Sequence, residues 1–212
     1  ASRRFPSYLA PAMTQLPELP LTLSRQEIRK MIRQRRRALT PEQQQEMGQQ
    51  AATRMMTYPP VVMAHTVAVF LSFDGELDTQ PLIEQLWRAD KSVYLPVLHP
   101  FSAGNLLFLN YHPQSELVMN RLKIHEPKLD VRDVLPLSRL DVLITPLVAF
   151  DEYGQRLGMG GGFYDRTLQN WQHYKTQPVG YAHDCQLVEK LPVEEWDIPL
   201  PAVVTPSKVW EW

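Results

Sequence analysis

The spacing of hydrophobic and polar positions changes along this chain. Residues 66–73, TVAVFLSF, form a nearly continuous apolar run, which is typical of a strand buried on both faces. Residues 79–90, TQPLIEQLWRAD, place apolar side chains at helical spacing, and residues 92–97, SVYLPV, form another strand-like run. A strand, a helix and a strand at this spacing predict a βαβ unit whose two strands are parallel.

The segment before this unit predicts two helices with marked starting points. Ser24 and Glu27 have the spacing of a capping box, and apolar residues then follow on one side of residues 25–37. Thr40 and Gln43 repeat the capping box, with a proline between them at the first helical position. The second helix is expected to end shortly before the two consecutive prolines that follow it.

Further strands complete the pattern. Residues 105–111, NLLFLNY, read as a strand, and residues 141–150, DVLITPLVAF, are strand-like up to their proline. PVGYAH at 178–183 and AVVTP at 202–206 predict two short late strands. Together these elements predict an α/β fold with a mostly parallel central sheet flanked by helices. In such sheets, ligands bind where the strands end.

The chain divides into a leader and one domain. Residues 1–23 contain four prolines and no sustained period, so we expect a disordered or loosely attached leader. Residues 24–212 are long enough for one core and are expected to form a single α/β domain. Met13 and Met31 are both possible translation starts, and a start at Met31 would remove part of the first helix.

Composition narrows the class of protein. A net charge of −1 gives no general attraction for nucleic acid or membranes, so charge-driven binding must come from a local patch. The single cysteine, Cys185, cannot form an intrachain disulfide and is expected to be a core residue in a reducing compartment. No apolar run approaches the ~18 residues of a membrane span, and the six histidines lack zinc-site spacing. We therefore expect a cytoplasmic protein.

The most unusual stretch is RLGMGGGFYDR, residues 156–166, which holds four of the nine glycines. Glycines at 158, 160 and 162 would let backbone N–H groups approach a ligand, and a helix expected from Tyr164 would add its own. Arg156 would supply a charge-assisted hydrogen bond. These are the parts of a phosphate-binding loop, although the stretch matches neither the dinucleotide fingerprint nor the Walker A pattern. A connection that only turns the chain is the alternative.

Residues 25–37 are strongly basic, because seven of these thirteen positions are Lys or Arg. Arg25, Arg29, Arg33 and Arg36 fall close to one line of the helix. Such a stripe is often only a solvated face. Its functional alternatives are contacts with the phosphates of a nucleotide or with a nucleic-acid backbone. The near-zero net charge and the lack of interleaved aromatic residues favour the nucleotide.

Carboxylates in other segments are candidates for binding. Asp74, Glu76 and Asp78 follow the first core strand, where a carboxylate can orient an amino-bearing heterocycle, although Asp78 is expected to cap the next helix. Asp197 lies among apolar residues and forms a candidate Mg²⁺ pair with Asp165. Mg²⁺ in proteins binds one or two carboxylates together with substrate phosphates.

These motifs, taken in order, resemble the 5-formyltetrahydrofolate cyclo-ligase family, also called methenyltetrahydrofolate synthetase. RLGMGGGFYD is similar to the family's RLG-x-G-x-GYYD, and the basic helix resembles its K-x-x-L-R opening. FLSFDGELDT at 70–79, KIHEP at 123–127 and EEWDIPLPAVVTP at 194–206 resemble further family segments. The resemblance covers residues 24–205. It implies a fold related in outline to the sugar-phosphate isomerase and coenzyme A transferase sheet folds.

The resemblance also implies a reaction that uses ATP and Mg²⁺. 5-Formyltetrahydrofolate would be closed to 5,10-methenyltetrahydrofolate through a phosphorylated formyl group (an imidate), with release of ADP and phosphate. Phosphoryl transfer needs mainly positioning and charge neutralisation, which a glycine loop, arginines and Mg²⁺ supply.

The family's site residues can be carried over to matching positions. Tyr164 and Arg156 would lie closest to the reacting groups, Leu71 and Glu76 would contact the folate, and Asp165 and Asp197 would hold Mg²⁺. The implied ATP-binding positions are Arg25, Arg29, Arg156, Leu157, Gly158, Met159, Gly160, Gly161, Gly162, Phe163 and Tyr164. Three of them depart from the family pattern: Arg25 replaces a lysine, Gly161 replaces a residue that is often lysine, and Phe163 lacks a tyrosine hydroxyl.

Two other interpretations remain open at the level of sequence. A nucleic-acid-binding module would use the helix at 25–37, and its affinity would fall steeply with salt. Another ATP-using enzyme on the same sheet would bind ATP without folate. The favoured interpretation predicts small-molecule substrates, no nucleic-acid or membrane partner, and a monomer.

Overall fold

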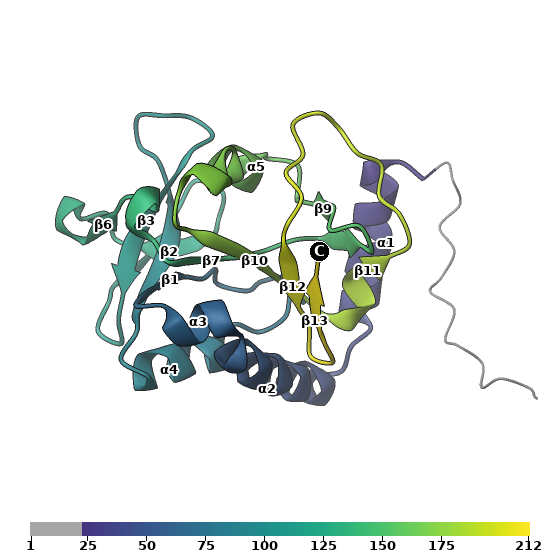
Figure 1. Ribbon diagram of the computed structural model, residues 1–212, viewed down its shortest axis with the longest axis horizontal. Coiled ribbons are helices and arrows are strands. Elements are labelled where there is room, and N and C mark those ends of the chain that lie inside the picture. The colour runs from purple at the N-terminus through teal and green to yellow at the C-terminus, as the bar shows by residue number, and fades with distance from the viewer. Residues whose placement is uncertain (1–22) are drawn as a thin grey trace, which may run out of the picture.

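The computed structural model describes residues 23–212 (Figure 1). The predicted leader therefore lies outside the described residues, except for Leu23. That side chain is partly buried and packs against a core cluster that contains Ile28 and Ile32. Leu23 thus belongs structurally to the domain that follows.

Five α-helices are present in this part of the chain, and their starts follow the sequence signals. The bounds are α1 Arg25–Arg37, α2 Pro41–Thr57, α3 Pro59–Met63, α4 Gln80–Arg88 and α5 Phe163–Leu168. Both predicted capping boxes are formed: Ser24 with Glu27 at α1, and Thr40 with Gln43 at α2. Each box satisfies N–H groups that would otherwise lack partners at a helix start.

Eight strands form the central sheet in the order β13-β12-β10-β7-β1-β2-β3-β6. Their bounds are β1 Thr66–Ala68, β2 Ser92–Leu98, β3 Leu106–Tyr111, β6 Val134–Leu135, β7 Val142–Thr145, β10 Gln177–Tyr181, β12 Ala202–Val204 and β13 Val209–Glu211. Strands β12, β10, β7, β1 and β2 are mutually parallel, while β3, β6 and β13 add antiparallel edges. The predicted mostly parallel sheet and its βαβ unit, β1-α4-β2, are confirmed.

Two smaller sheets complete the fold. One pairs β11 (Leu187–Val188), β8 (Ala149–Asp151) and β9 (Arg156–Leu157), and the other is a two-stranded ribbon of β4 (Leu117–Met119) and β5 (His125–Pro127). The ribbon was not predicted from the sequence.

One predicted strand is too long. The run at 66–73 forms a strand only as far as Ala68; the Val69 N–H still donates to the Tyr94 carbonyl of β2, and Val69 and Phe70 continue as buried chain. The segment at 141–150 is a strand up to Pro146, as predicted, and the chain beyond this proline, which has no N–H to donate, forms β8 of the small sheet. The apolar run after Ala68 therefore indicates burial rather than a longer strand, and the chain that leaves the sheet there becomes available to the site.

Helices cover both faces of the sheet (Figure 1). Helices α2, α3 and α4 lie below it in this view, α5 lies above it, and α1 lies at the right beside the small sheet. The lower layer packs Met55, Leu82 and Leu86 against strand residues such as Val67 and Ile144. Helix α1 buries Ile28 and Ile32 against the small sheet. At about 1.5–3 kcal/mol for each fully buried side chain, these two isoleucines hold α1 against the rest of the domain.

Candidate active site

A cavity of about 530 Å³ opens at the carboxyl ends of the parallel strands. Phe70 follows β1, Leu98 ends β2, and Pro146 follows β7, and all three line this cavity. This is where ligands are expected in an α/β sheet. The glycine segment 158–162 and helix α1 close the cavity from another side. We call it the main cavity.

Most of the residues singled out in the sequence meet here. Those that line the main cavity are Arg25, Arg29, Leu71, Glu76, Arg156, Gly158, Met159, Gly160, Gly161, Gly162, Phe163, Tyr164 and Asp165. Of the site residues that the resemblance implies, two do not line it: the Leu157 side chain packs into the core beside α1, and Asp197 pairs with Arg25. Leu157 could contact ATP only through its backbone, so its side chain serves packing.

The glycine segment adopts a backbone that requires glycine at two positions. Gly160 has φ +112° and Gly162 has φ +70°, which L-residues with side chains rarely adopt. Helix α5 begins directly after Gly162, at Phe163 rather than at the predicted Tyr164. Because α5 has only six residues, its aligned dipole is small, and the exposed amides of the segment are the main feature available to an anion.

Helix α1 is tied to the glycine segment by Arg29. Its Nε donates to the Gly158 carbonyl at 2.8 Å, and only 6% of the residue is exposed. Burial, and next the positive charges of Arg25 and Arg33, lower the Arg29 pKa, although the guanidinium stays charged. The remaining guanidinium nitrogens face Gly160. They form a cationic edge beside the glycine amides.

The interpretation of the basic helix as a simple solvated face is wrong for two of its arginines. Arg29 and Arg36 are buried, with 6% and 4% exposed. Arg36 lies within 3.8 Å of the Asp74 carboxylate, outside the main cavity. The stripe therefore divides its charges between the cavity, an internal contact and the surface, instead of presenting one continuous cationic face.

Arg25 contacts a carboxylate from a distant part of the chain. Its two terminal nitrogens donate to Asp197 at 2.6 and 3.1 Å, and Asp197 also accepts the Glu194 N–H at 2.8 Å. A planar guanidinium suits this two-point contact, which a lysine could not reproduce. The arginine that stands in place of the family's lysine thus has a definite structural role.

Arg156 is the most enclosed cation of the site. It is 5% exposed, its Nε donates to the Pro146 carbonyl at 2.9 Å, and its terminal nitrogen lies 3.7 Å from Asp165. The guanidinium also lies over the Tyr164 ring, 5.5 Å from its centre. Burial raises the pKa of the Tyr164 hydroxyl far above its usual value, so this hydroxyl remains protonated and can donate.

The three acidic residues of the 74–78 turn have different environments. Asp74 pairs with Arg37 at 2.8 Å, away from the cavity. Asp78 accepts the Gln80 N–H at 3.0 Å and so supports the start of α4, although the capping position is Thr79. Only Glu76 lines the main cavity.

Glu76 is a carboxyl group with a raised pKa. It accepts the Phe73 N–H at 3.1 Å, and burial raises its pKa to about 7, against the opposing effects of that hydrogen bond and of Arg36. The turn that carries it is held by His183, whose Nε2 lies 3.1 Å from the Gly75 carbonyl. Glu76 therefore gains or loses a proton near neutral pH inside the cavity.

The two candidate Mg²⁺ ligands approach each other. Asp165 accepts the Ile198 N–H at 3.2 Å, so the segment with Asp197 lies against α5. Within residues 23–212, no group of three or more His, Cys, Asp or Glu side chains could hold a metal ion. Asp165 faces the main cavity and fits a Mg²⁺ ion that takes its other ligands from phosphates and water. The Asp197 oxygens already accept three hydrogen bonds, two of them from Arg25.

Sequence reasoning missed one wall of the cavity. The β4–β5 ribbon contributes Asn120, Leu122, Ile124, His125 and Glu126. Part of this ribbon is the KIHEP segment, to which the resemblance assigned no role. Its residues have ordinary spacing and composition, so nothing local shows that the ribbon folds over the strand ends.

Arg166 also contributes to the site, although the sequence analysis assigned it no role. Its Nε donates to the Gly104 carbonyl and its terminal nitrogen to the Gly161 carbonyl, both at 2.6 Å. The same guanidinium lies 5.4 Å from the centre of the Phe163 ring. Arg166 therefore connects the glycine segment to the loop between β2 and β3.

Comparison with known proteins identifies a family and close relatives for this chain. The family model of the 5-formyltetrahydrofolate cyclo-ligase family matches residues 22–206. The 5-formyltetrahydrofolate cyclo-ligase of Escherichia coli (strain K12) is 99% identical over 182 residues, which are 86% of this chain and 100% of that protein. Its counterpart in Haemophilus influenzae is 53% identical over 179 residues, covering 84% of this chain and 96% of that protein.

Solved structures show the same fold. The NMR structure of the Aquifex aeolicus 5,10-methenyltetrahydrofolate synthetase superposes with a TM-score of 0.76 at 28% identity, covering 89% of this chain and 93% of that one. The Mycoplasma pneumoniae synthetase, at 20% identity and a TM-score of 0.69 over 87% of this chain and 99% of that one, supports the fold alone.

An α/β sheet with a polar-rimmed cavity at its strand ends is the arrangement of a small-molecule enzyme. The chain belongs to the 5-formyltetrahydrofolate cyclo-ligase family, and the protein is thus an enzyme of the cyclo-ligase class. None of the helices in residues 23–212 is both long enough and apolar enough to cross a membrane.

Proposed function

We propose that this enzyme uses ATP to close 5-formyltetrahydrofolate to 5,10-methenyltetrahydrofolate, releasing ADP and phosphate. One observation carries the proposal: a single cavity joins a glycine segment with exposed amides, two buried arginines and an acidic turn. The first two features suit a polyphosphate, and the third suits the amino-bearing pterin ring. The names of the relatives support the same reaction.

The chemistry proceeds in two balanced steps. First, the formyl oxygen attacks the γ-phosphorus of ATP, the bond to the bridging oxygen breaks, and ADP leaves. The formyl carbon then carries a phosphate, which is a far better leaving group than an amide oxygen. Second, N10 attacks this carbon and loses its proton, the carbon–oxygen bond breaks, and phosphate departs. The new ring contains the formyl carbon between N5 and N10.

Residues of the main cavity fit the needs of the first step. The amides of residues 158–162, with Arg29 and Arg156, would neutralise charge on the γ-phosphoryl group as it moves. Tyr164, whose hydroxyl stays protonated, would donate to a phosphoryl or formyl oxygen. Asp165 would hold a Mg²⁺ ion, which shields the phosphates when it is bound.

Residues of the opposite wall would orient the folate. Glu76 as a carboxylate would accept hydrogen bonds from the pterin amino group and ring N–H, and Leu71 would pack against the ring. Arg25, held by Asp197, would contact the outer phosphates at the rim. A monomeric cytoplasmic enzyme acting on these two small molecules remains the expectation from the sequence.

A direct assay tests the proposal. Folinic acid and MgATP are mixed with the enzyme, and the near-ultraviolet absorbance of the methenyl product is followed together with ADP release. We expect both products in a 1:1 ratio and none without ATP. Product formation that does not need ATP would refute the nucleotide part. ADP release without the methenyl product would identify another ATP-using enzyme.

A further inference from the structure

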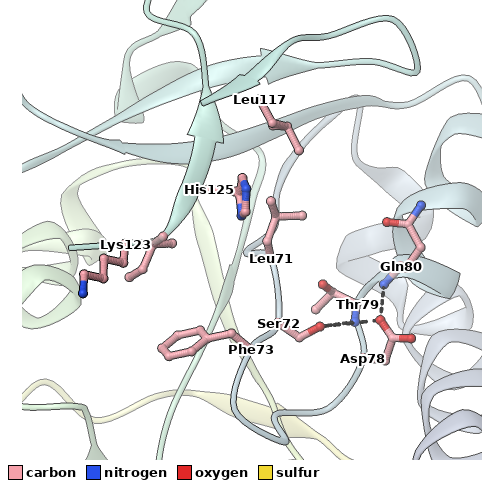
Figure 2. A pocket seen from close by; sticks show the side chains of 10 residues that line it. Leu71, Ser72, Phe73, Asp78, Thr79, Gln80, Leu117, Lys123 and His125 are labelled. Atoms are coloured by element: carbon pink, nitrogen blue, oxygen red, sulfur yellow. Dashed lines mark hydrogen bonds between the residues drawn. The ribbon is translucent and has the colours of Figure 1, made fainter. Parts of the chain in front are cut away.

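The loop of residues 70–79 carries Glu76 to the main cavity, and its base is closed by its own hydrogen bonds. Thr79 Oγ1 donates to the Phe70 carbonyl at 2.7 Å. The Thr79 N–H donates to Ser72 Oγ at 3.3 Å, as Figure 2 shows. These two bonds fix where the loop begins and ends, but neither of them reaches its tip.

The tip of this loop, residues 74–76, contains two consecutive residues with a left-handed backbone. Asp74 has φ +51° and Gly75 has φ +75°. A residue with a side chain is less stable in this region than in the usual ones, so it stays there only where the surrounding structure holds it. The direction in which Glu76 leaves the tip is therefore set by contacts from outside the loop.

Three other segments supply these contacts. Arg37 of α1 pairs with Asp74 at 2.8 Å. Gln44 of α2 donates through its Nε2 to the Gly75 carbonyl at 3.1 Å. His183, which follows β10, contacts the same carbonyl through its Nε2, also at 3.1 Å. One carbonyl of the tip thus accepts hydrogen bonds from two segments that are far apart in the chain.

His183 is the buried member of this set, with 1% of the residue exposed. Its backbone N–H donates to Gln186 Oε1 at 2.8 Å, and Gln186 Nε2 donates to the Leu147 carbonyl at 2.8 Å. Because a carbonyl oxygen can only accept, the ring proton lies on Nε2 in the contact with Gly75. Burial, and to a smaller extent the charge of Arg36, lower the His183 pKa, so the ring is neutral at pH 7. A fixed, neutral donor therefore holds the tip.

We propose that His183 is a positioning residue for folate recognition: its Nε2–H fixes the Gly75 carbonyl, and thereby the direction and the enclosure of the Glu76 carboxyl group in the main cavity. The assignment rests on the proposed function, in which Glu76 binds the pterin ring. His183 does not itself line the main cavity, so it acts only through the turn. Without its N–H, the tip leaves the left-handed conformation and the carboxyl group turns toward water.

The affinity for folinic acid, measured by calorimetry without ATP, tests this role. His183→Ala removes the donor, and we expect the Kd for folinic acid to rise about five- to tenfold while the Kd for ATP stays unchanged. His183→Gln brings an amide N–H close to the position of Nε2, so its Kd for folinic acid should lie within about twofold of wild type. A general loss of structure would instead weaken both ligands in both variants.

The pH dependence of the same affinity gives a second readout. The groups that face Glu76 are Arg36 from α1, Asp74 from its own turn, Tyr164 from α5 and His183 through the turn. In wild type, folinic acid should bind more tightly as pH rises through about 7, because the carboxylate is the accepting form. In His183→Ala, water reaches the carboxyl group, its pKa falls toward the ordinary value, and this rise in affinity should move to lower pH.

Glu76→Gln identifies that rise and completes a double-mutant cycle. It should abolish the pH-dependent rise, because a glutamine does not ionise. In this background, His183→Ala should raise the Kd for folinic acid by less than about twofold, because no carboxylate remains to be positioned. An equal effect of His183→Ala in both backgrounds, or a matching loss of ATP affinity, would overturn the proposal.

Gln44 decides the question if His183→Ala does not fold. It lies partly exposed on α2 and donates to the same carbonyl, so Gln44→Ala should raise the Kd for folinic acid about two- to threefold. The control is Gln50→Ala, at an exposed position of α2 that pairs with Glu46, and it should change neither Kd. An unchanged Kd in Gln44→Ala would then refute the role of this carbonyl. If wild type binds no folinic acid at all, the proposed function fails instead.

Discussion

At the scale of single residues, Glu76 gives stability a pH dependence. Burial raises its pKa from 4.5 to about 7, so the folded protein holds this proton more tightly than the unfolded chain. The contribution is fully present below about pH 4.5 and is lost as pH rises through about 7. Because water in the cavity still reaches the group, the loss is about 2 kcal/mol rather than the full value of the shift.

The Glu76→Gln variant should remove this dependence. A glutamine keeps an oxygen that can accept the Phe73 N–H and never ionises. Denaturant unfolding at pH 5 and pH 8 measures the effect. We expect the variant to gain about 2 kcal/mol relative to wild type between these two pH values. The control Glu189→Gln, at an exposed position, should show no such gain. An equal difference at both pH values would mean that Glu76 is not a protonated, buried carboxyl.

Arg29 offers a second test at the residue scale. Replacing it with alanine removes both the hydrogen bond to Gly158 and a cation beside the glycine amides. A charge-assisted contact is worth about 1.5–3 kcal/mol, so the KM for ATP should rise roughly tenfold or more. Steady-state kinetics with saturating folinic acid measures it. Arg33→Ala, one turn along α1 and outside the main cavity, is the control. An unchanged KM for ATP would remove α1 from the nucleotide site.

At the scale of elements, Arg166 connects the glycine segment to the loop between β2 and β3. It donates to carbonyls of Gly104 and Gly161, so the glycine segment is held from its outer side. In Arg166→Gln, the amides of 158–162 should lose their fixed orientation. We expect the KM for ATP to rise several-fold and hydrogen exchange in this segment to increase.

Two variants separate this positioning role from a general loss of charge. Arg166→Lys should recover little, because an ammonium group lacks the planar fork that reaches both carbonyls. Arg132→Gln, which removes an exposed arginine paired with Asp130, should change neither observable. Faster exchange without a change in KM would show that the orientation of the segment does not limit ATP binding.

The elements also show which local signals are reliable. Capping boxes at Ser24 and Thr40 located two helix starts, because the side chains and the N–H groups they satisfy lie within four residues of each other. Apolar runs were less informative about length, since the apolar run at 66–73 continues as buried chain after the strand ends at Ala68. The β4–β5 ribbon was missed because its position depends on distant strand ends rather than on its own sequence.

In the site, too, features set by nearby residues were found from the sequence, and features set by distant contacts were not. The glycine segment was found because a backbone with positive φ, as at Gly160 and Gly162, favours glycine, and glycines are visible in the sequence. The partner of Arg25 could not be found, since Asp197 lies 172 residues away and reaches it only through the fold. The raised pKa of Glu76 was equally invisible, because it depends on burial by the assembled cavity walls. Sequence therefore supplied the list of candidates, and packing assigned their charge states and partners.

At the scale of the whole molecule, α1 is the element that completes the main cavity from the N-terminal side. Ile28 and Ile32 bury it against the small sheet, Arg25 anchors it to Asp197, and Arg29 anchors it to the glycine segment. Each contact joins residues that are more than a hundred positions apart in the chain. The nucleotide side of the site therefore depends on α1 being in place.

This dependence leads to a prediction for a chain that starts at Met31. It would lack Ser24, Arg25, Ile28 and Arg29, and hence the cap, the core contact of Ile28 and both anchors. Losing a buried isoleucine and a helix cap together costs about 3–6 kcal/mol of stability. We expect a lowered melting temperature and no measurable ATP binding by calorimetry.

A full-length double variant, Arg25→Gln with Arg29→Gln, distinguishes lost binding from lost folding. It keeps the Ser24 cap and Ile28, so its melting temperature should stay much closer to that of the wild type. Its ATP affinity should nevertheless fall with that of the shortened chain, because both cations that α1 contributes to the main cavity are gone. If the shortened chain and the double variant both bind ATP as the wild type does, then α1 packs against this site without forming part of it, and the phosphates must be held by Arg156 and the glycine amides alone.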